Sequence, residues 1–110
     1  MSEPIFVLNV PELVNMDMST NITSPVMDLG EVGGFAVHSI FTGSPVGSLQ
    51  VEASNTQNAS DFIPMDTYAV TAAGKRLINV EKTHYKYIRI TYTFTSGTGS
   101  LTSYVSAKRI

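Results

Sequence analysis

Residues that alternate between apolar and polar side chains recur along most of this chain, whereas helical periodicity is nearly absent. Alternating runs start near residues 35, 48, 86 and 101. Antiparallel sheets with one face in water show this period-two pattern. The side chains that the pattern places on the core side are Phe35, Val37, Phe41, Leu49, Val51, Ala53, Ile88, Ile90, Tyr92, Phe94, Leu101, Val105 and Ala107.

Three further strands are predicted near residues 24–29, 68–72 and 76–80, with a polar loop at 55–66 and a turn at 72–75. Seven or eight short strands in 110 residues favour an all-β fold. We predict an antiparallel β-sandwich with a jelly-roll-like topology, and a closed barrel is the alternative.

Two blocks of similar sequence, 41–49 and 94–101, each combine an alternating strand, a Gly/Ser-rich turn and another strand. Glycine readily adopts the positive φ angles that tight turns require. Each block is therefore predicted to form a β-hairpin, and two such hairpins would supply opposing halves of a sandwich.

The first residues differ from the rest because they are apolar at both parities of a strand. Prolines at positions 4 and 11 bracket this segment. A strand that is apolar on both faces must be covered on both faces. The segment is either a central strand covered by a loop or an arm that docks on another subunit, and its terminal position favours the arm. We therefore expect an N-terminal arm or clasp at 1–18 and a sandwich domain at 19–110, with interface residues Ile5, Phe6, Val7, Leu8 and Val10.

Composition narrows the classes of partner. The chain has 7 Lys and Arg against 9 Asp and Glu, without a basic stripe, so we expect no nucleic-acid partner. No stretch approaches the roughly 20 apolar residues of a membrane span, and the start lacks a signal-peptide pattern. Charged residues make up 15% of the chain, below the roughly 25% of a typical soluble domain. Such a surface suits a protein that is packed against other proteins.

Candidate chemistry is sparse. His38 and His84 do not form a metal-binding spacing, and the acidic residues do not match a calcium loop. The absence of cysteine excludes disulfides, thiolate zinc sites and a cysteine nucleophile. We therefore predict a non-enzymatic protein with no cofactor and no metal, although folding can still bring an acid and a base together.

Tyr85 and Tyr87 fall on the outward parity beside Arg89. Tyrosine and arginine are enriched where protein interfaces are strongest, so these three residues form the predicted contact patch. The alternative for Tyr87 is a tyrosine at a corner of the sandwich whose hydroxyl bonds to the backbone.

Segments 23–29, 35–55 and 87–101 resemble a strand, Gly/Pro turn and strand unit of small virion proteins in tailed bacteriophages. The resemblance implies a β-sandwich that decorates or cements a phage head, clamps neighbouring capsid subunits and has no active site. It also implies the major capsid protein as partner and a position on the capsid exterior after synthesis in the host cytoplasm. We expect a homo-oligomer, a dimer or a trimer. The alternative function is a receptor- or glycan-binding module of a tail fibre or spike.

Overall fold

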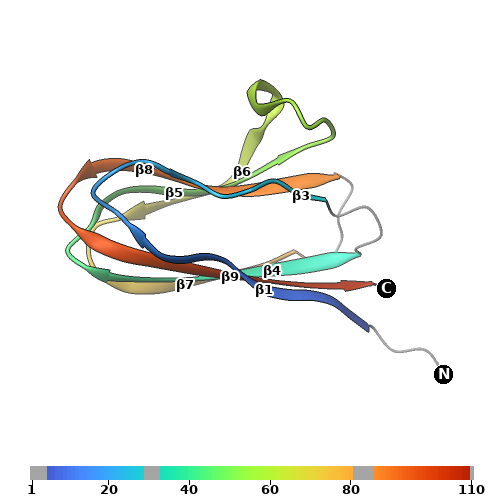
Figure 1. The fold of residues 1–110 in the computed structure, drawn as a ribbon, viewed down its shortest axis with the longest axis horizontal. Coiled ribbons are helices and arrows are strands. Elements are labelled where there is room, and N and C mark those ends of the chain that lie inside the picture. The colour runs from blue at the N-terminus through green and yellow to red at the C-terminus, as the bar shows by residue number, and fades with distance from the viewer. Residues whose placement is uncertain (1–4, 29–32, 81–85, 110) are drawn as a thin grey trace.

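Two antiparallel sheets packed face to face form the protein in this computed structural model, which describes residues 5–28, 33–80 and 86–109 (Figure 1). Sheet A has the spatial order β1-β9-β4-β7, with bounds Ile5–Asp17, Gly99–Arg109, Gly34–Gly43 and Gly74–Val80. Sheet B has the order β2-β8-β5-β6, with bounds Ile22–Thr23, Tyr87–Ser96, Val46–Ser54 and Ile63–Val70. The short strand β3, Met27–Asp28, also pairs with β8. The predicted antiparallel β-sandwich is confirmed.

The order of the strands is that of a jelly roll. The chain passes from sheet A to sheet B after β1, returns to sheet A for β4 and crosses to sheet B for β5 and β6. It then changes sheets before each of the last three strands, with β7 in sheet A, β8 in sheet B and β9 in sheet A. Strands that are neighbours in a sheet are therefore mostly distant in sequence, as in β1 beside β9 and β4 beside β9. This two-sheet arrangement fits the jelly-roll-like topology that the alternation predicts.

The two similar Gly/Ser blocks form arches between the sheets, so the prediction of two hairpins is wrong. β4 lies in sheet A and β5 in sheet B, while β8 lies in sheet B and β9 in sheet A. The arches lie against each other, because β4 pairs with β9 and β5 pairs with β8. Glycine is needed here for close approach of the backbones. A Cβ on Gly97, which has φ +83°, would lie 2.0 Å from the carbonyl oxygen of Ser44.

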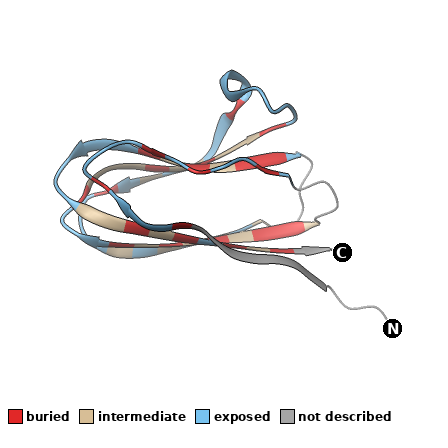
Figure 2. Cartoon of the chain, viewed as in Figure 1, coloured by how far each residue is buried: buried red, intermediate tan, exposed pale blue. Residues whose placement is uncertain are grey.

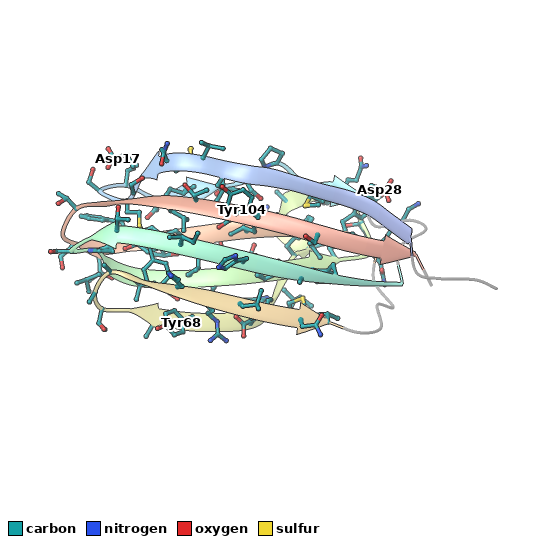
Figure 3. All side chains as sticks on the ribbon, turned by 90° about the horizontal axis from the view of Figure 1, so that it is seen from below. Asp17, Asp28, Tyr68 and Tyr104 are labelled. Atoms are coloured by element: carbon teal, nitrogen blue, oxygen red, sulfur yellow. The ribbon has the colours of Figure 1, made fainter. Side chains whose placement is uncertain are left out.

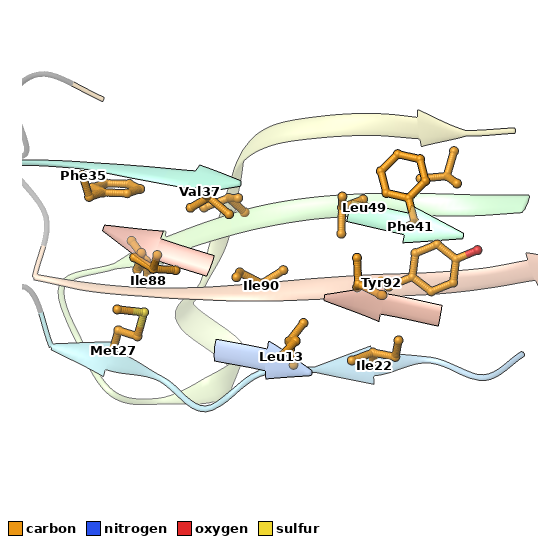
Figure 4. Packing of buried hydrophobic residues seen from close by; sticks show 14 of the residues in the cluster. Leu13, Ile22, Met27, Phe35, Val37, Phe41, Leu49, Ile88, Ile90 and Tyr92 are labelled. Carbon is orange, nitrogen blue, oxygen red and sulfur yellow. The ribbon is translucent and has the colours of Figure 1, made fainter. Parts of the chain in front are cut away.

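The core lies between the sheets and combines side chains that the alternation places inward with others, such as Leu13, Ile22 and Met27 (Figure 4). Ile88, Ile90, Leu101 and Val105 are fully buried. Figure 2 shows the buried residues running along the middle of both sheets. Phe94 is the exception among the predicted core residues, since it lies near the end of β8 and is 36% exposed. Burial of this kind supplies most of the free energy that favours folding.

Residues 5–17 form β1, an edge strand of sheet A, instead of an arm apart from the sandwich. β1 pairs with β9 from Ile5 opposite Arg109 to Asp17 opposite Ser100, with register shifts on the way. Leu13 and Met18 are buried in the core. The structure therefore has no domain boundary at residue 18, because the predicted arm contributes a strand and core side chains to the same domain. It is also not the central strand that was the other prediction.

The strand predicted at 24–29 is interrupted. Ser24 lies between β2 and β3, and it takes the place of a paired strand residue opposite Ile90. Its backbone N–H donates to the Ile90 carbonyl at 2.8 Å, and the Ile90 N–H donates to the Ser24 hydroxyl oxygen at 2.8 Å. The serine side chain thus keeps the backbone of β8 hydrogen-bonded across the break, which is required for buried N–H groups.

The polar loop predicted at 55–66 ends earlier, because β6 begins at Ile63. The loop contains a short 3₁₀ helix, η1, at Ala59–Asp61, and it projects above sheet B in Figure 1. The Asn58 side chain caps η1 by accepting a hydrogen bond from the Ser60 N–H at 3.2 Å. Proline at position 64 and the polar run at 54–61 hid this strand from the sequence pattern.

Candidate protein-binding surface

The outer surface of sheet A carries a regular grid of side chains on three of its four strands, β9, β4 and β7. His38 on β4 lies opposite Tyr104 on one side and Leu77 on the other. Its neighbours in the chain, Val37 and Ser39, point into the core, so His38 faces outward. The same alternation gives nine outward positions in three rows, namely Ser106, Ala36 and Asn79; Tyr104, His38 and Leu77; Thr102, Ile40 and Lys75. We call these nine residues the sheet A face (Figure 3).

The sheet A face combines exposed apolar side chains with very few charges. Leu77 is 66% exposed and Tyr104 is 40% exposed, while Ile40 is half-buried among its neighbours. The rings of His38 and Tyr104 lie 6.5 Å apart at an interplanar angle of 39°. Lys75 is the one Lys, Arg, Asp or Glu among the nine residues. Exposed aromatic and aliphatic groups with little charge are features that the centres of protein interfaces share.

The outer surface of sheet B is different in chemistry. Thr91 lies opposite Thr23 on β2 and Gln50 on β5, and Gln50 in turn lies opposite Thr67 on β6. The next row places Thr93 opposite Ser48. Hydroxyl and amide groups therefore line the middle of this surface, while the exposed apolar residues Ile63 and Met65 lie at the start of β6. The contrast between the two outer surfaces favours sheet A as the docking side.

The predicted contact patch of Tyr85, Tyr87 and Arg89 is not an exposed cluster in the described part of the chain. Tyr85 lies outside the described residues. Tyr87 has the predicted outward parity but is only 8% exposed, with the Lys86 ammonium 5.6 Å from its ring centre. Tyr87 is therefore packed, as in the corner-tyrosine alternative, although no hydrogen bond joins its hydroxyl to another described residue. Its role at an interface stays a prediction.

Arg89 instead holds the projecting loop on sheet B. Its Nε donates to the carboxylate of Glu52 on β5 at 2.7 Å, and its guanidinium stacks on the ring of Phe62 at 4.4 Å. A second donor, Nη2, reaches the carbonyl of Ala59 in η1 at 3.3 Å. The ion pair is mostly buried, with the two side chains 17% and 12% exposed. These contacts give Arg89 a structural role, whatever its part in docking.

The apolar residues predicted to mark the N-terminal interface, Ile5, Phe6, Val7, Leu8 and Val10, all lie in the first half of β1. The described structure gives their backbone pairing with β9 and not their side-chain surroundings. Their role at an interface stays a prediction.

A groove of about 450 Å³ lies between the projecting loop and the start of β6. Ile63 and Met65 line it and are 69% and 37% exposed. Its one carboxylate, Asp61, already accepts a hydrogen bond from the Thr56 hydroxyl at 2.7 Å. The lining contains no aromatic ring among the residues that the structure describes. A glycan site would be expected to offer such a ring. The groove is therefore a weaker candidate for the main binding site than the sheet A face.

The remaining candidates for chemistry stay apart. His38 lies on the sheet A face and His84 lies outside the described residues. Within the described ranges, no three His, Asp or Glu residues come close enough together to hold a metal ion. No helix in that part of the chain is long and apolar enough to cross a membrane.

Solved structures share this fold, although the sequence comparisons give no match. No protein-family model matches the chain, and no curated protein has a significantly similar sequence. The SPBc2 prophage-derived protein YomS has a similar structure, with a TM-score of 0.58 and 10% identity over 96% of both chains. The K3 cleaved adhesin domain of Lys-gingipain from Porphyromonas gingivalis has a TM-score of 0.58 and 15% identity over 90% of this chain and 72% of its own.

A third similar structure is that of infectious bursal disease virus, Gx strain. The TM-score is 0.53 and the identity 13%, over 97% of this chain and 32% of the viral chain. At these identities the similarity shows the fold alone. The same sandwich thus occurs in a prophage protein, a bacterial adhesin domain and a virus structure, so the function must be argued from the surface of this chain.

Sequence reasoning did not single out the sheet A face. Leu77 and Ile40 are the residues that it missed. The signal was present in part: both share the outward parity of their strands with polar neighbours two residues away, at Lys75 and His38. Only the strand order shows that these positions from β4, β7 and β9 form one surface.

Proposed function

We propose that this chain is a non-enzymatic structural protein of a phage virion that binds the outside of the head as a decoration or cement protein. The observation that carries the proposal is the sheet A face, in which exposed Tyr104 and Leu77 flank His38 on a flat, charge-poor sheet. Burying such a surface costs little desolvation free energy, because few charged groups have to be removed from water. Its partner in this proposal is the major capsid protein.

The mechanism is passive adhesion. A rigid sandwich orders few side chains on docking, which keeps the entropic cost of binding low. The Tyr104 side chain adds contact area with few rotatable bonds. Its hydroxyl can also donate a hydrogen bond to a carbonyl or carboxylate of the capsid. Several copies bound to one lattice, or joined in a dimer or trimer, would strengthen attachment through avidity. The proposed location follows: the exterior of the capsid.

The test is cosedimentation of the full chain with assembled heads of the phage that carries its gene. We expect the chain to pellet with the heads and to saturate at a stoichiometry set by the capsid lattice. A chain that stays in the supernatant at every ratio contradicts the proposal. Binding to a glycan array in the absence of heads would instead support the receptor-binding alternative, for which the groove beside Ile63 and Met65 is the site to examine.

A further inference from the structure

The four sheet edges of this protein differ in how well they are protected against pairing with another strand. An unprotected edge exposes a row of backbone N–H and C=O groups that a further strand can satisfy. On sheet B, one edge is split into the two-residue strands β2 and β3, with Pro25 between them. The other edge, β6, contains Pro64, which has no backbone N–H to donate to a further strand.

The β7 edge of sheet A is protected by charge. β7 begins with Gly74, Lys75 and Arg76, and Arg76 reaches across to β6 on sheet B. Its guanidinium makes a two-pronged contact with Asp66, at 2.7 and 3.0 Å, and lies over the Tyr68 ring at 4.7 Å. These contacts link the two sheets along this side of the sandwich.

β1 is the fourth edge and is thirteen residues long. Among the described strands it pairs with β9 alone, so its other side carries unpaired backbone groups. The second half has four features that oppose pairing: Pro11, the charges of Glu12 and Asp17, and Asn15 with φ +49°. The first half, residues 5–10, has no proline and no charged residue, and one register shift between Phe6 and Leu8.

From this asymmetry we infer that residues 5–10 of β1 pair antiparallel with the same residues of a second copy of this chain. An antiparallel match of one strand with its own copy is a twofold, isologous contact, which is the commonest symmetry of homodimers. The absence of charge in this segment means that no like charges meet at the axis. The two copies of sheet A then form one continuous eight-stranded sheet.

The dimer would extend the proposed function, because it presents two docking surfaces together. Its role in docking rests on that proposed function. The twofold axis of such a pair is perpendicular to the sheet, so the two sheet A faces point to the same side. A capsid would then be contacted by two copies of Tyr104 and Leu77 at once, and the second contact would benefit from high effective concentration. Six paired residues bury less than a standard interface of about 1,600 Å², so we expect a concentration-dependent dimer.

The experiment measures the mass of the full chain in solution without capsids, by sedimentation across a range of concentrations. We expect a shift from 11.9 kDa towards twice that mass as concentration rises. Val7→Lys should remain a monomer throughout, because lysine on an edge strand opposes pairing. Thr67→Lys, which adds the same charge to the exposed β6 edge, should still dimerise. A wild-type monomer at all concentrations, or a dimer unchanged by Val7→Lys, overturns the inference.

A cysteine scan keeps the inference testable if Val7→Lys does not fold. The chain has no cysteine, so each single variant from position 5 to 10 reports on one site only. We expect oxidation to give covalent dimers at the one or two neighbouring positions nearest the axis. Ile63→Cys, on the exposed start of β6, should stay monomeric. Cross-linking at Ile63 and at no position of 5–10 would assign the contact to β6 and overturn the inference. Because no capsid is present, this result is independent of the proposed function.

Discussion

His38 and Tyr104 place their rings 6.5 Å apart on the outer surface of sheet A, where β4 and β9 are neighbours. Sixty-six residues separate them in the sequence, and the crossing of the chain between sheets brings them together. With Leu77 on the other side of His38, they form the central row of the surface to which we assign docking. The account therefore depends on the jelly-roll order of the strands as much as on the residues themselves.

Glycine at position 97 is predicted to be essential for the contact between the two arches. Gly97→Ala places a Cβ against the Ser44 carbonyl and forces alanine into the left-handed region, at φ +83°. We expect a loss of more than about 2 kcal/mol in the free energy of unfolding, measured by urea denaturation.

Gly74→Ala is the matched control. Its Cβ would lie 3.3 Å from a ring atom of Phe41, a side chain that can shift slightly, and Gly74 has no positive φ. The loss there should be clearly smaller. Equal losses at the two positions would show that the close approach of the arches is not a constraint.

A buried serine pair links β4 and β9 on the core side of sheet A. The hydroxyl oxygens of Ser39 and Ser103 are 2.8 Å apart, and both residues are buried. Ser39→Ala leaves the Ser103 hydroxyl without its partner, at a cost of about 1–3 kcal/mol. The double variant Ser39→Ala with Ser103→Ala removes both groups, so its loss should be less than the sum of the two single losses. Strict additivity in this double-mutant cycle would refute a mutual hydrogen bond.

Tyr92 gives the chain a predictable response to alkaline pH. Its buried hydroxyl has no hydrogen-bond partner among the described residues, and burial raises the pKa of Tyr92 above its ordinary value of 10.0. Near and above pH 10 the unfolded chain releases the Tyr92 proton more readily than the folded chain does. The free energy of unfolding therefore falls as pH rises. Tyr92→Phe should therefore change stability little at pH 7 and reduce the loss of stability above pH 10.

Urea denaturation at pH 7 and above pH 10 provides the measurement for Tyr92. Tyr104→Phe is the control, since that ring is exposed and should leave the alkaline loss unchanged. If Tyr92→Phe loses as much stability at alkaline pH as the wild type, another group causes the loss.

Arg89 is predicted to act on the projecting loop. Arg89→Met removes the contacts with Glu52 and Ala59 and leaves a buried carboxylate without its partner. We expect a loss of about 3 kcal/mol, typical of breaking a buried pair, and faster amide exchange in residues 55–62. If exchange in the loop is unchanged while capsid binding is lost, Arg89 is an interface residue, as the sequence first suggested.

The sequence predicts the sandwich and its core well because the period-two pattern is local. Val37 and Val105 reach the core for the reason that the alternation gives. Strand partners are not local. A Gly/Ser turn suits a hairpin and an arch equally, so nothing near Gly43 or Gly97 indicates that the chain changes sheets there.

The candidate site was harder to predict for the same reason. Arg89 looked exposed because its parity is outward, but Glu52, 37 residues away, and the loop above it cover that part of sheet B. Leu77 looked unremarkable because it is a single apolar residue in a short strand. Its importance appears only when β7, β4 and β9 are placed side by side.

The most direct test of the docking claim is cosedimentation of three purified proteins with phage heads: the wild type, Leu77→Glu and Thr93→Glu. Both substituted residues are exposed, Leu77 on sheet A and Thr93 on sheet B, and unfolding curves should show that both variants remain folded. We predict that Leu77→Glu weakens binding at least tenfold, or about 1.4 kcal/mol, while Thr93→Glu binds as the wild type does. Undiminished binding by Leu77→Glu, or loss of binding by Thr93→Glu alone, would contradict docking through sheet A.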